Sequence, residues 1–244
     1  MKKLFTLLGV LIMFSVSGFA AQEVAANIQC IPISHASFVI VADTITIYVD
    51  PTGDAKRYTN IQPPDMILIT HTHFDHFDKV LISALKKQKT VIVGTKAAVG
   101  ELSYGTILNN GDNKKYGSVS VEAVPAYNIS PERRQYHPKG EGNGYVVAVA
   151  GKRIYISGDT EDTAEMRNLK NIDYAFVCMN LPYTMSVEQA ASGVLAFKPR
   201  TVFPYHYRQG EGFADVAKFK QLVAREKSIE VKLLDWYRIP VPQE

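Results

Sequence analysis

The chain has 244 residues, of which 46% are hydrophobic and 21% are charged, so it is long enough for one domain with a substantial core. Its 27 Lys and Arg residues against 24 Asp and Glu residues give a formal net charge of +3. That balance excludes the strongly basic surface expected of a nucleic-acid-binding protein. The sequence contains no internal repeat and no low-complexity linker.

The beginning of the chain has the features of a secretory signal peptide. Two lysines follow the first Met, an apolar run extends from Leu4 to about Val16, and Gly18-Phe19-Ala20 supplies a cleavage site of small residues. The run is too short for a comfortable transmembrane helix. We therefore predict a signal peptide at 1–20 and one domain at 21–244. The expected protein is exported, periplasmic or secreted, with no membrane span after processing. Without the two lysines, 25 basic against 24 acidic residues leave a net charge of about +1.

Two cysteines, Cys30 and Cys178, lie inside apolar stretches. In an oxidising compartment they could form a disulfide, but two separately buried thiols are the preferred interpretation. Neither cysteine has the spacing of a zinc site.

Short apolar strands and amphipathic helices alternate along the chain. The continuous apolar run at 66–70 is typical of a strand buried on both faces. Strand-rich blocks followed by strand–helix alternation, in two roughly equal halves, predict two sheets with helices outside. The predicted strands are 28–33, 37–41, 45–49, 66–70, 91–93, 117–124, 144–150, 152–157, 174–179, 201–203 and 229–234. The predicted helices are 78–88, 95–103, 163–169, 186–198 and 213–226.

A dense cluster of metal-binding residue types follows the strand at 66–70, in the motif His71-Thr72-His73-Phe74-Asp75-His76. Three imidazoles and a carboxylate at the end of a rigid strand suit divalent metal ions. The first two histidines can point to one side while the Asp and the last His serve a second site. The whole chain has six histidines, so three of them in this motif indicate a metal centre rather than solvated side chains.

With this motif the chain resembles the metallo-β-lactamase superfamily, over nearly all of the sequence after the signal peptide. That family places an Asp after a later strand and a His after a still later one, where this chain has Gly158-Asp159-Thr160 and Pro204-Tyr205-His206. The resemblance implies an α/β fold, the four-layer αββα sandwich. It also implies two divalent ions: one held by His71, His73 and a third His, the other by Asp75, His76 and His206, with Asp159 bridging them.

The opening of the chain is similar to one branch of the superfamily, the ascorbate-phosphate lactonase-like and N-acylphosphatidylethanolamine phospholipase-like proteins. The matching segments are Ser34-His35-Ala36-Ser37-Phe38 and Val49-Asp50-Pro51. The resemblance implies that His35 and Asp50 lie near the metal ions, supporting a ligand or facing the substrate. Structural hydrogen bonding is the alternative role.

One ligand departs from the family pattern. The third His of the first metal usually comes from a strand end near residue 128, where this chain has Ala126-Tyr127-Asn128. We predict that His137, further along the chain, folds back to complete the site. Asn128 as a weak oxygen ligand and a depleted first site are the alternatives.

The ligand set suits Zn²⁺, Mn²⁺ and Fe²⁺, and Zn²⁺ is the expectation. The resemblance implies hydrolysis of a small ester, lactone or phosphodiester by a metal-bound hydroxide, with Asp75 and Asp159 as the catalytic carboxylates. Asp75 is the candidate to orient the nucleophile and receive its proton. An exported β-lactamase is the second hypothesis. A metal-binding protein without hydrolytic activity, used in sensing or interaction, is a hypothesis of another class.

An anionic small-molecule substrate is a further hypothesis, because cations cluster near the predicted ligands. Such charges bind phosphate or carboxylate, although charged side chains on a solvated loop are common. Tyr183, which follows a predicted strand, is a candidate for the pocket wall. The cations are Arg133, Arg134, Lys139 and Arg208.

Overall fold

The computed structural model describes residues 21–25 and 27–237. The predicted signal peptide at 1–20 lies outside the described residues. Within them, no helix is both long enough and apolar enough to cross a membrane.

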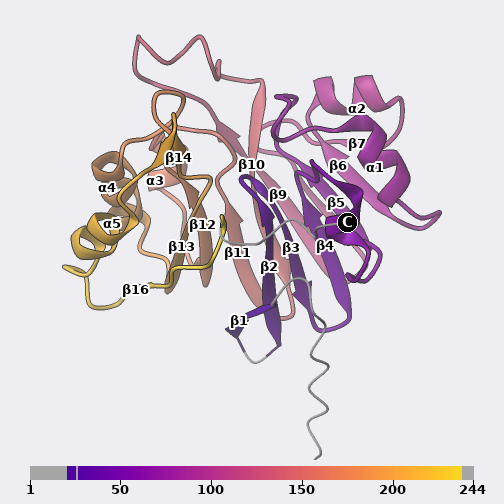
Figure 1. The fold of residues 1–244 in the computed structure, drawn as a ribbon, viewed down its shortest axis with the longest axis horizontal. Helices are drawn as coiled ribbons and strands as arrows, with labels where there is room; N and C mark the ends of the chain where they lie inside the picture. The colour runs from indigo at the N-terminus through magenta and orange to yellow at the C-terminus, as the bar shows by residue number, and fades with distance from the viewer. Residues whose placement is uncertain (1–20, 26, 238–244) are drawn as a thin grey trace, which may run out of the picture.

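Two seven-stranded sheets make up the body of the structure, and each is built by one half of the chain (Figure 1). Each sheet is antiparallel for its first four strands and parallel beyond them. The first sheet contains β1 Gln22–Ala25, β2 Ile28–Ser34, β3 Ser37–Ala42, β4 Ile45–Val49, β5 Met66–Ile69, β6 Val91–Gly94 and β7 Thr106–Ile107. The second contains β8 Asn113–Tyr116, β9 Val119–Ala126, β10 Gly142–Val149, β11 Lys152–Ile156, β12 Tyr174–Cys178, β13 Thr201–Tyr205 and β16 Glu230–Val231.

Helices cover the outer faces of both sheets (Figure 1). The first sheet carries α1 and α2 on one flank of the molecule, and the second carries α3, α4 and α5 on the opposite flank. This arrangement confirms the four-layer αββα sandwich. The helices are η1 Ala55–Tyr58, α1 Lys79–Leu85, α2 Lys96–Leu102, α3 Ala164–Arg167, α4 Val187–Phe197 and α5 Val216–Val223.

Strand β5 shows why the run before the His-rich motif is apolar at every position. Met66 and Leu68 belong to the core between the sheets, whereas Ile67 and Ile69 pack with Leu81 of α1 in the outer core. Successive side chains of a strand point to opposite faces, so a strand covered on both faces needs apolar residues throughout. The motif therefore begins at the end of a fully buried, rigid strand.

Several short elements were not predicted. Strand β8 carries Lys114 and Lys115 and is largely exposed, so no apolar pattern marks it. The strand predicted at 117–124 begins at Val119, because Gly117 has a φ of +60° and lies in the turn between β8 and β9. Also missed were β1, β7 and the hairpin of β14 Arg208–Gln209 and β15 Gly212–Phe213.

The helices are shorter than predicted at both ends: each begins one or more residues later, after its capping residue, and each ends one to three residues earlier. The largest difference is in α5, predicted at 213–226. The Asp215 carboxylate accepts a hydrogen bond from the backbone N–H of Lys218 at 2.8 Å, which places the first turn at Val216.

Candidate metal centre

The predicted site residues meet where strands of both sheets end at one edge. The motif 71–76 follows β5, Asp159 follows β11 and His206 follows β13. Two hydrogen bonds join the sheets here: the Tyr145 hydroxyl donates to the Ile69 carbonyl at 2.7 Å, and the Asn143 N–H donates to the Thr70 carbonyl at 2.9 Å. The carboxyl ends of parallel strands are the usual place for a site in an α/β fold.

One cluster gathers His71, His73 and His137, whose ring nitrogens lie within 4.8 Å of one another. His71 Nε2 is 3.1 Å from His73 Nδ1, and the rings of His73 and His137 are centred 4.9 Å apart. The segment between β9 and β10 thus brings His137 beside His71 and His73.

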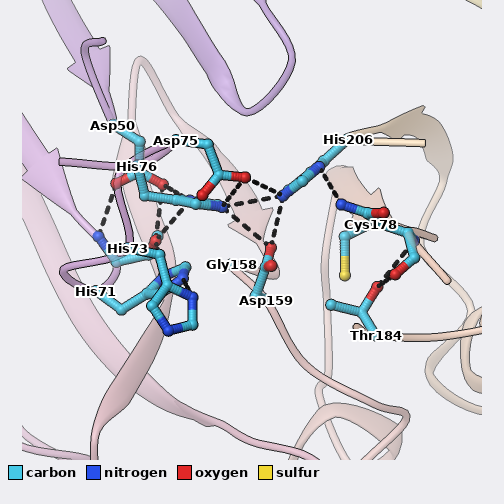
Figure 2. A network of polar contacts seen from close by, with 12 residues as sticks. Asp50, His71, His73, Asp75, His76, Gly158, Asp159, Cys178, Thr184 and His206 are labelled. Carbon is cyan, nitrogen blue, oxygen red and sulfur yellow. Dashed lines mark hydrogen bonds and ion pairs between the residues drawn. The ribbon is translucent and has the colours of Figure 1, made fainter. Parts of the chain in front are cut away.

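A second cluster gathers His76, His206, Asp75 and Asp159, and Figure 2 shows Asp159 in contact with both of these histidines. His76 Nε2 and His206 Nε2 are 3.0 Å apart, and Asp159 Oδ1 lies 3.3 and 3.1 Å from them. Asp75 Oδ2 is 3.6 Å from His206 Nε2. The other oxygen of Asp159 is 3.3 Å from His137 Nε2, so this carboxylate reaches both clusters.

The position of Asp159 depends on the glycine before it. Gly158 has a φ of +60°, and a Cβ at this residue would lie 2.8 Å from the Asn143 carbonyl oxygen. Only glycine adopts this conformation without strain in so little space.

Two observations test whether these residues fit divalent cations. First, in a tetrahedral site two ligand atoms that are each about 2.0–2.1 Å from the Zn²⁺ lie about 3.3 Å from each other. The distances between ligand atoms within both clusters are close to this value. Second, His137 Nε2 and Asp159 Oδ1 are buried and have no hydrogen-bond partner among the described residues. Buried polar atoms without partners are costly, and a cation in each cluster would satisfy them: one beside His137 Nε2 and one beside Asp159 Oδ1. The residues therefore fit a pair of divalent ions.

Asp50 and Thr70 determine which histidine nitrogens face the centre. Asp50 Oδ2 accepts from His76 Nδ1 at 2.8 Å and from the Thr70 hydroxyl at 2.7 Å. Because that hydroxyl donates its proton to Asp50, it accepts from His71 Nδ1, at 2.9 Å. Both Nδ1 protons are thus engaged, and the Nε2 lone pairs point into the centre. Asp50 is fully buried, so the structure assigns it ligand support rather than substrate contact.

His137 is oriented by Asn128 and by the backbone at Tyr183. Asn128 Nδ2 donates to the carbonyls of Arg133 at 2.9 Å and Tyr183 at 2.7 Å. With both amide protons engaged, His137 Nδ1 carries its own proton and donates it to the Tyr183 carbonyl at 3.2 Å. His137 Nε2 is then left with its lone pair toward Asp159.

Glu161 anchors the segment that carries His137. Its buried carboxylate accepts from the backbone N–H groups of Ile129 and Ser130 at 2.7 and 2.6 Å, and it pairs with Arg133. Burial alone would raise the pKa of Glu161, but the hydrogen bonds from Ser130 and Arg133 hold it below its ordinary value. Sequence reasoning missed Glu161, and its nearness to Asp159 in the chain was the available signal.

Asp75 faces the pocket with a partly exposed side chain and is held by His35. His35 Nε2 is 3.3 Å from Asp75 Oδ2, and His35 Nδ1 is 2.9 Å from the Tyr237 hydroxyl. That hydroxyl accepts from the backbone N–H of Tyr207 at 3.2 Å and donates to His35, which leaves the Nε2 proton for Asp75. Burial raises the pKa of Asp75, but the His35 hydrogen bond and the charge of His76 outweigh it, so the pKa falls. No sequence pattern marked Tyr237.

His35 also offers a ligand atom within 4.8 Å of those of Asp75 and His206. The Asn180 side-chain amide, at the end of β12, lies 3.2 Å from His206 Nδ1 and supports this histidine from behind.

The electrostatics of the centre favour metal binding by most of its imidazoles. Burial lowers the pKa values of His71, His73 and His206, so these rings are neutral at pH 7 and present lone pairs. Burial would also lower the pKa of His76, but the carboxylates of Asp159 and Asp50 raise it. The carboxylates and the neutral rings together form a binding site of net negative charge.

Two cavities flank the histidine clusters. One of about 480 Å³ lies over Asp75 and Asp159 and includes Tyr183 in its wall, as the sequence predicts. The other, of about 700 Å³, lies beside α2. His73, Tyr136 and His137 line both cavities. Away from the centre, Cys30 and Cys178 are buried free thiols.

Comparison with known proteins places this geometry in a family. Residues 32–206 match the model of the β-lactamase superfamily domain. A UPF0173 metal-dependent hydrolase of Pelotomaculum thermopropionicum is 31% identical over 218 residues, covering 83% of this chain and 94% of that protein. The crystal structure of a protein from Parabacteroides distasonis, assigned as a metal-dependent hydrolase, is 40% identical with a TM-score of 0.78, covering 84% of this chain and 92% of that one.

A more distant structure supports the fold alone. The metallo hydrolase Igni18 of Ignicoccus hospitalis is 23% identical with a TM-score of 0.72, covering 85% of this chain and 95% of that chain. The proteins from Pelotomaculum thermopropionicum and Parabacteroides distasonis align over most of this chain and over more than nine-tenths of their own length, and both are assigned as metal-dependent hydrolases. The chain therefore belongs to the metallo-β-lactamase superfamily and, within it, to the UPF0173 family of metal-dependent hydrolases.

Proposed function

We propose that this protein hydrolyses a small ester, lactone or phosphodiester at a centre of two divalent ions, with Zn²⁺ as the resident metal. The observation that carries the proposal is the pair of ligand clusters that share Asp159 at the base of the 480 Å³ cavity. His71, His73 and His137 would hold one ion. Asp75, His76 and His206 would hold the other, and Asp159 would contact both.

The protein's own residues have distinct tasks in this reaction. Bound divalent ions would lower the pKa of water from about 15.7 to about 7 and withdraw charge from substrate oxygens. Asp75, ionised and exposed to the cavity, orients the attacking water and accepts its proton. His35 fixes the rotamer of Asp75. The water adds to the carbonyl carbon or phosphorus, the bond to the leaving oxygen breaks, and that oxygen leaves with the proton that Asp75 accepted from the water.

The similarity of the opening segments favours a lactonase-like or phospholipase-like reaction over β-lactam hydrolysis. In the structure both matching segments of that opening reach the centre: His35 contacts Asp75, and Asp50 contacts His76. The signal peptide predicted at 1–20 favours export, and hence a substrate met outside the cytoplasm.

A chromogenic panel tests the proposal directly. The protein beginning at residue 21 is assayed on a phosphodiester, a phosphomonoester, a lactone, an ester and a β-lactam. Each assay is run with added Zn²⁺ or Mn²⁺ and after chelation. Chelator-sensitive turnover of an ester, lactone or phosphodiester is the expected result. Turnover of the β-lactam alone would support the second hypothesis. Bound metal without any turnover would contradict the hydrolase and favour a metal-binding role.

A further inference from the structure

The four cations near the centre differ in whether they remain available to a ligand. Arg133 is engaged by the buried carboxylate of Glu161. Lys139 pairs with Glu165 at 3.2 Å and lies 4.6 Å from the centre of the Tyr127 ring. These two side chains therefore hold the loop in place.

Of the remaining two, only one reaches the cavity. Arg134 donates through Nε to the Ile129 carbonyl and does not line the 480 Å³ cavity. Arg208 does line it, together with Asp75 and Asp159. Across the described residues, Arg208 forms no ion pair, although two carboxylates lie in the same cavity wall.

Aromatic packing holds Arg208 at the cavity. It begins the β14–β15 hairpin, two positions after His206, and pairs across that hairpin with Phe213. Its guanidinium lies 5.9 Å from the centre of the Tyr237 ring, which packs on Phe213 with centroids 4.6 Å apart. A cation–π contact of this length leaves the N–H groups of the guanidinium free to bind an oxyanion.

Part of the cavity lining is apolar and exposed. Phe74, inside the His-rich motif, is 89% exposed, and Tyr183 is 46% exposed. Pro182 lies beside Tyr183 in the same wall. Large apolar side chains exposed together at the mouth of a cavity are typical of a surface that contacts an apolar ligand.

We propose that the substrate carries two recognition groups beside the bond that is cleaved: an oxyanion bound by Arg208 and an apolar group packed against Phe74 and Tyr183. The substrate class is thus an anionic ester or lactone with an aliphatic or aromatic part. This inference rests on the proposed hydrolase function. The oxyanion is a carboxylate or a phosphate, and the experiment separates them.

Matched substrates test the inference in the metal-loaded protein. Three 4-nitrophenyl esters of equal acyl length end in a carboxylate, a phosphate or a methyl group. Arg208→Gln is expected to lower kcat/KM about tenfold or more for the preferred anionic ester and to leave the methyl ester unchanged. Phe74→Ala is expected to lower kcat/KM for all three. Arg134→Gln is the matched control outside the cavity. Equal effects of Arg208→Gln on charged and neutral esters would overturn the assignment.

A binding measurement separates this inference from the proposed function. Benzylphosphonate, benzoate and benzyl alcohol are titrated into the metal-loaded protein by calorimetry. The expected result is about a tenfold rise in Kd for an anionic probe in Arg208→Gln, with no change for the alcohol. If Arg208→Gln weakens anion binding but the wild-type protein hydrolyses no ester, the anion site is supported and the hydrolase function is contradicted. If the wild-type protein hydrolyses an ester but Arg208→Gln binds the anionic probes as tightly as the wild type, the hydrolase function is supported and the anion site is contradicted.

Discussion

The hydrogen-bond partners of the histidines determine how these ligands present themselves. Asp50 and Thr70 engage the Nδ1 protons of His71 and His76, and the Tyr183 carbonyl engages that of His137. Each partner selects one tautomer and one ring orientation, which ligands of a metal centre need before the metal arrives. A mutation of such a partner is therefore expected to weaken metal binding by about 10–100-fold.

His137 gives the sharpest test at this scale. His137→Ala is expected to reduce the metal content by about one ion per chain, because it removes one of three imidazoles from the first cluster. Elemental analysis of the purified protein measures the content. Tyr136→Phe, a change in the adjacent residue of the same loop, serves as the control and should keep the full content. Full metal content in His137→Ala would return the role to Asn128.

Asp75 tests the chemistry, and the metal content of the variant is measured alongside because Asp75 is also a proposed ligand. Asp75→Asn is expected to lower kcat by about 10²–10⁴-fold, because the amide cannot accept the proton of the attacking water. Steady-state kinetics on the best substrate of the panel measures the change. Glu132→Gln alters an exposed carboxylate on the loop that carries His137 and should leave kcat unchanged. Equal turnover in Asp75→Asn and wild type would remove Asp75 from the catalytic step.

At the scale of elements, Glu161 is one of the anchors of the segment between β9 and β10, which carries His137. The pKa of Glu161 lies below its ordinary value of 4.5 in the folded protein. A lowered folded-state pKa stabilises the fold above the ordinary value, and this contribution is lost as the pH falls through the folded-state pKa. Acid is thus expected to release the loop by protonating Glu161.

Hydrogen exchange of the metal-free protein tests this release. Protection of the amides at 128–137 is expected to fall as the pH is lowered below 4.5, the ordinary pKa of a glutamate, because the folded-state pKa of Glu161 lies below that value. Glu161→Gln should show low protection already at pH 5. Protection that is independent of pH in the wild type would show that other contacts anchor the loop.

At the scale of the whole molecule, the metal centre connects the two halves of the chain. His71, His73, Asp75 and His76 come from the first sheet, whereas Asp159 and His206 come from the second. Ions bound between them stabilise the folded state but not the separated segments. Metal at 100 times its Kd is expected to add about 2.7 kcal/mol to the free energy of unfolding.

Thermal unfolding measures this contribution. Chelation is expected to lower Tm, and returning Zn²⁺ should restore it. The variant His71→Ala/His206→Ala, which lacks one imidazole from each cluster, should show little response to either treatment. A Tm that chelation does not change in the wild type would contradict a structural link through the metal.

The sequence by itself determined which residue types bind the metal and in what order the strands follow one another along the chain. Alternating and continuous apolar runs reflect which faces of a strand are buried. The strands β2 to β6 and β9 to β13 were therefore predictable as strands, although not with their exact bounds. The motif after β5 indicated the metal ligands, because imidazoles and a carboxylate at that spacing have few other uses.

Only the tertiary structure decided how distant residues meet. Asp50 lies behind His76, Tyr237 behind His35, and Glu161 beneath the loop of His137, through hydrogen bonds that leave no periodic pattern in the sequence. The same holds for the cations. No pattern in the sequence separates Arg133 from Arg208, yet Arg133 pairs with a buried carboxylate and Arg208 faces the cavity. Local patterns report burial and propensity, whereas the partner of a polar side chain depends on how the two sheets pack.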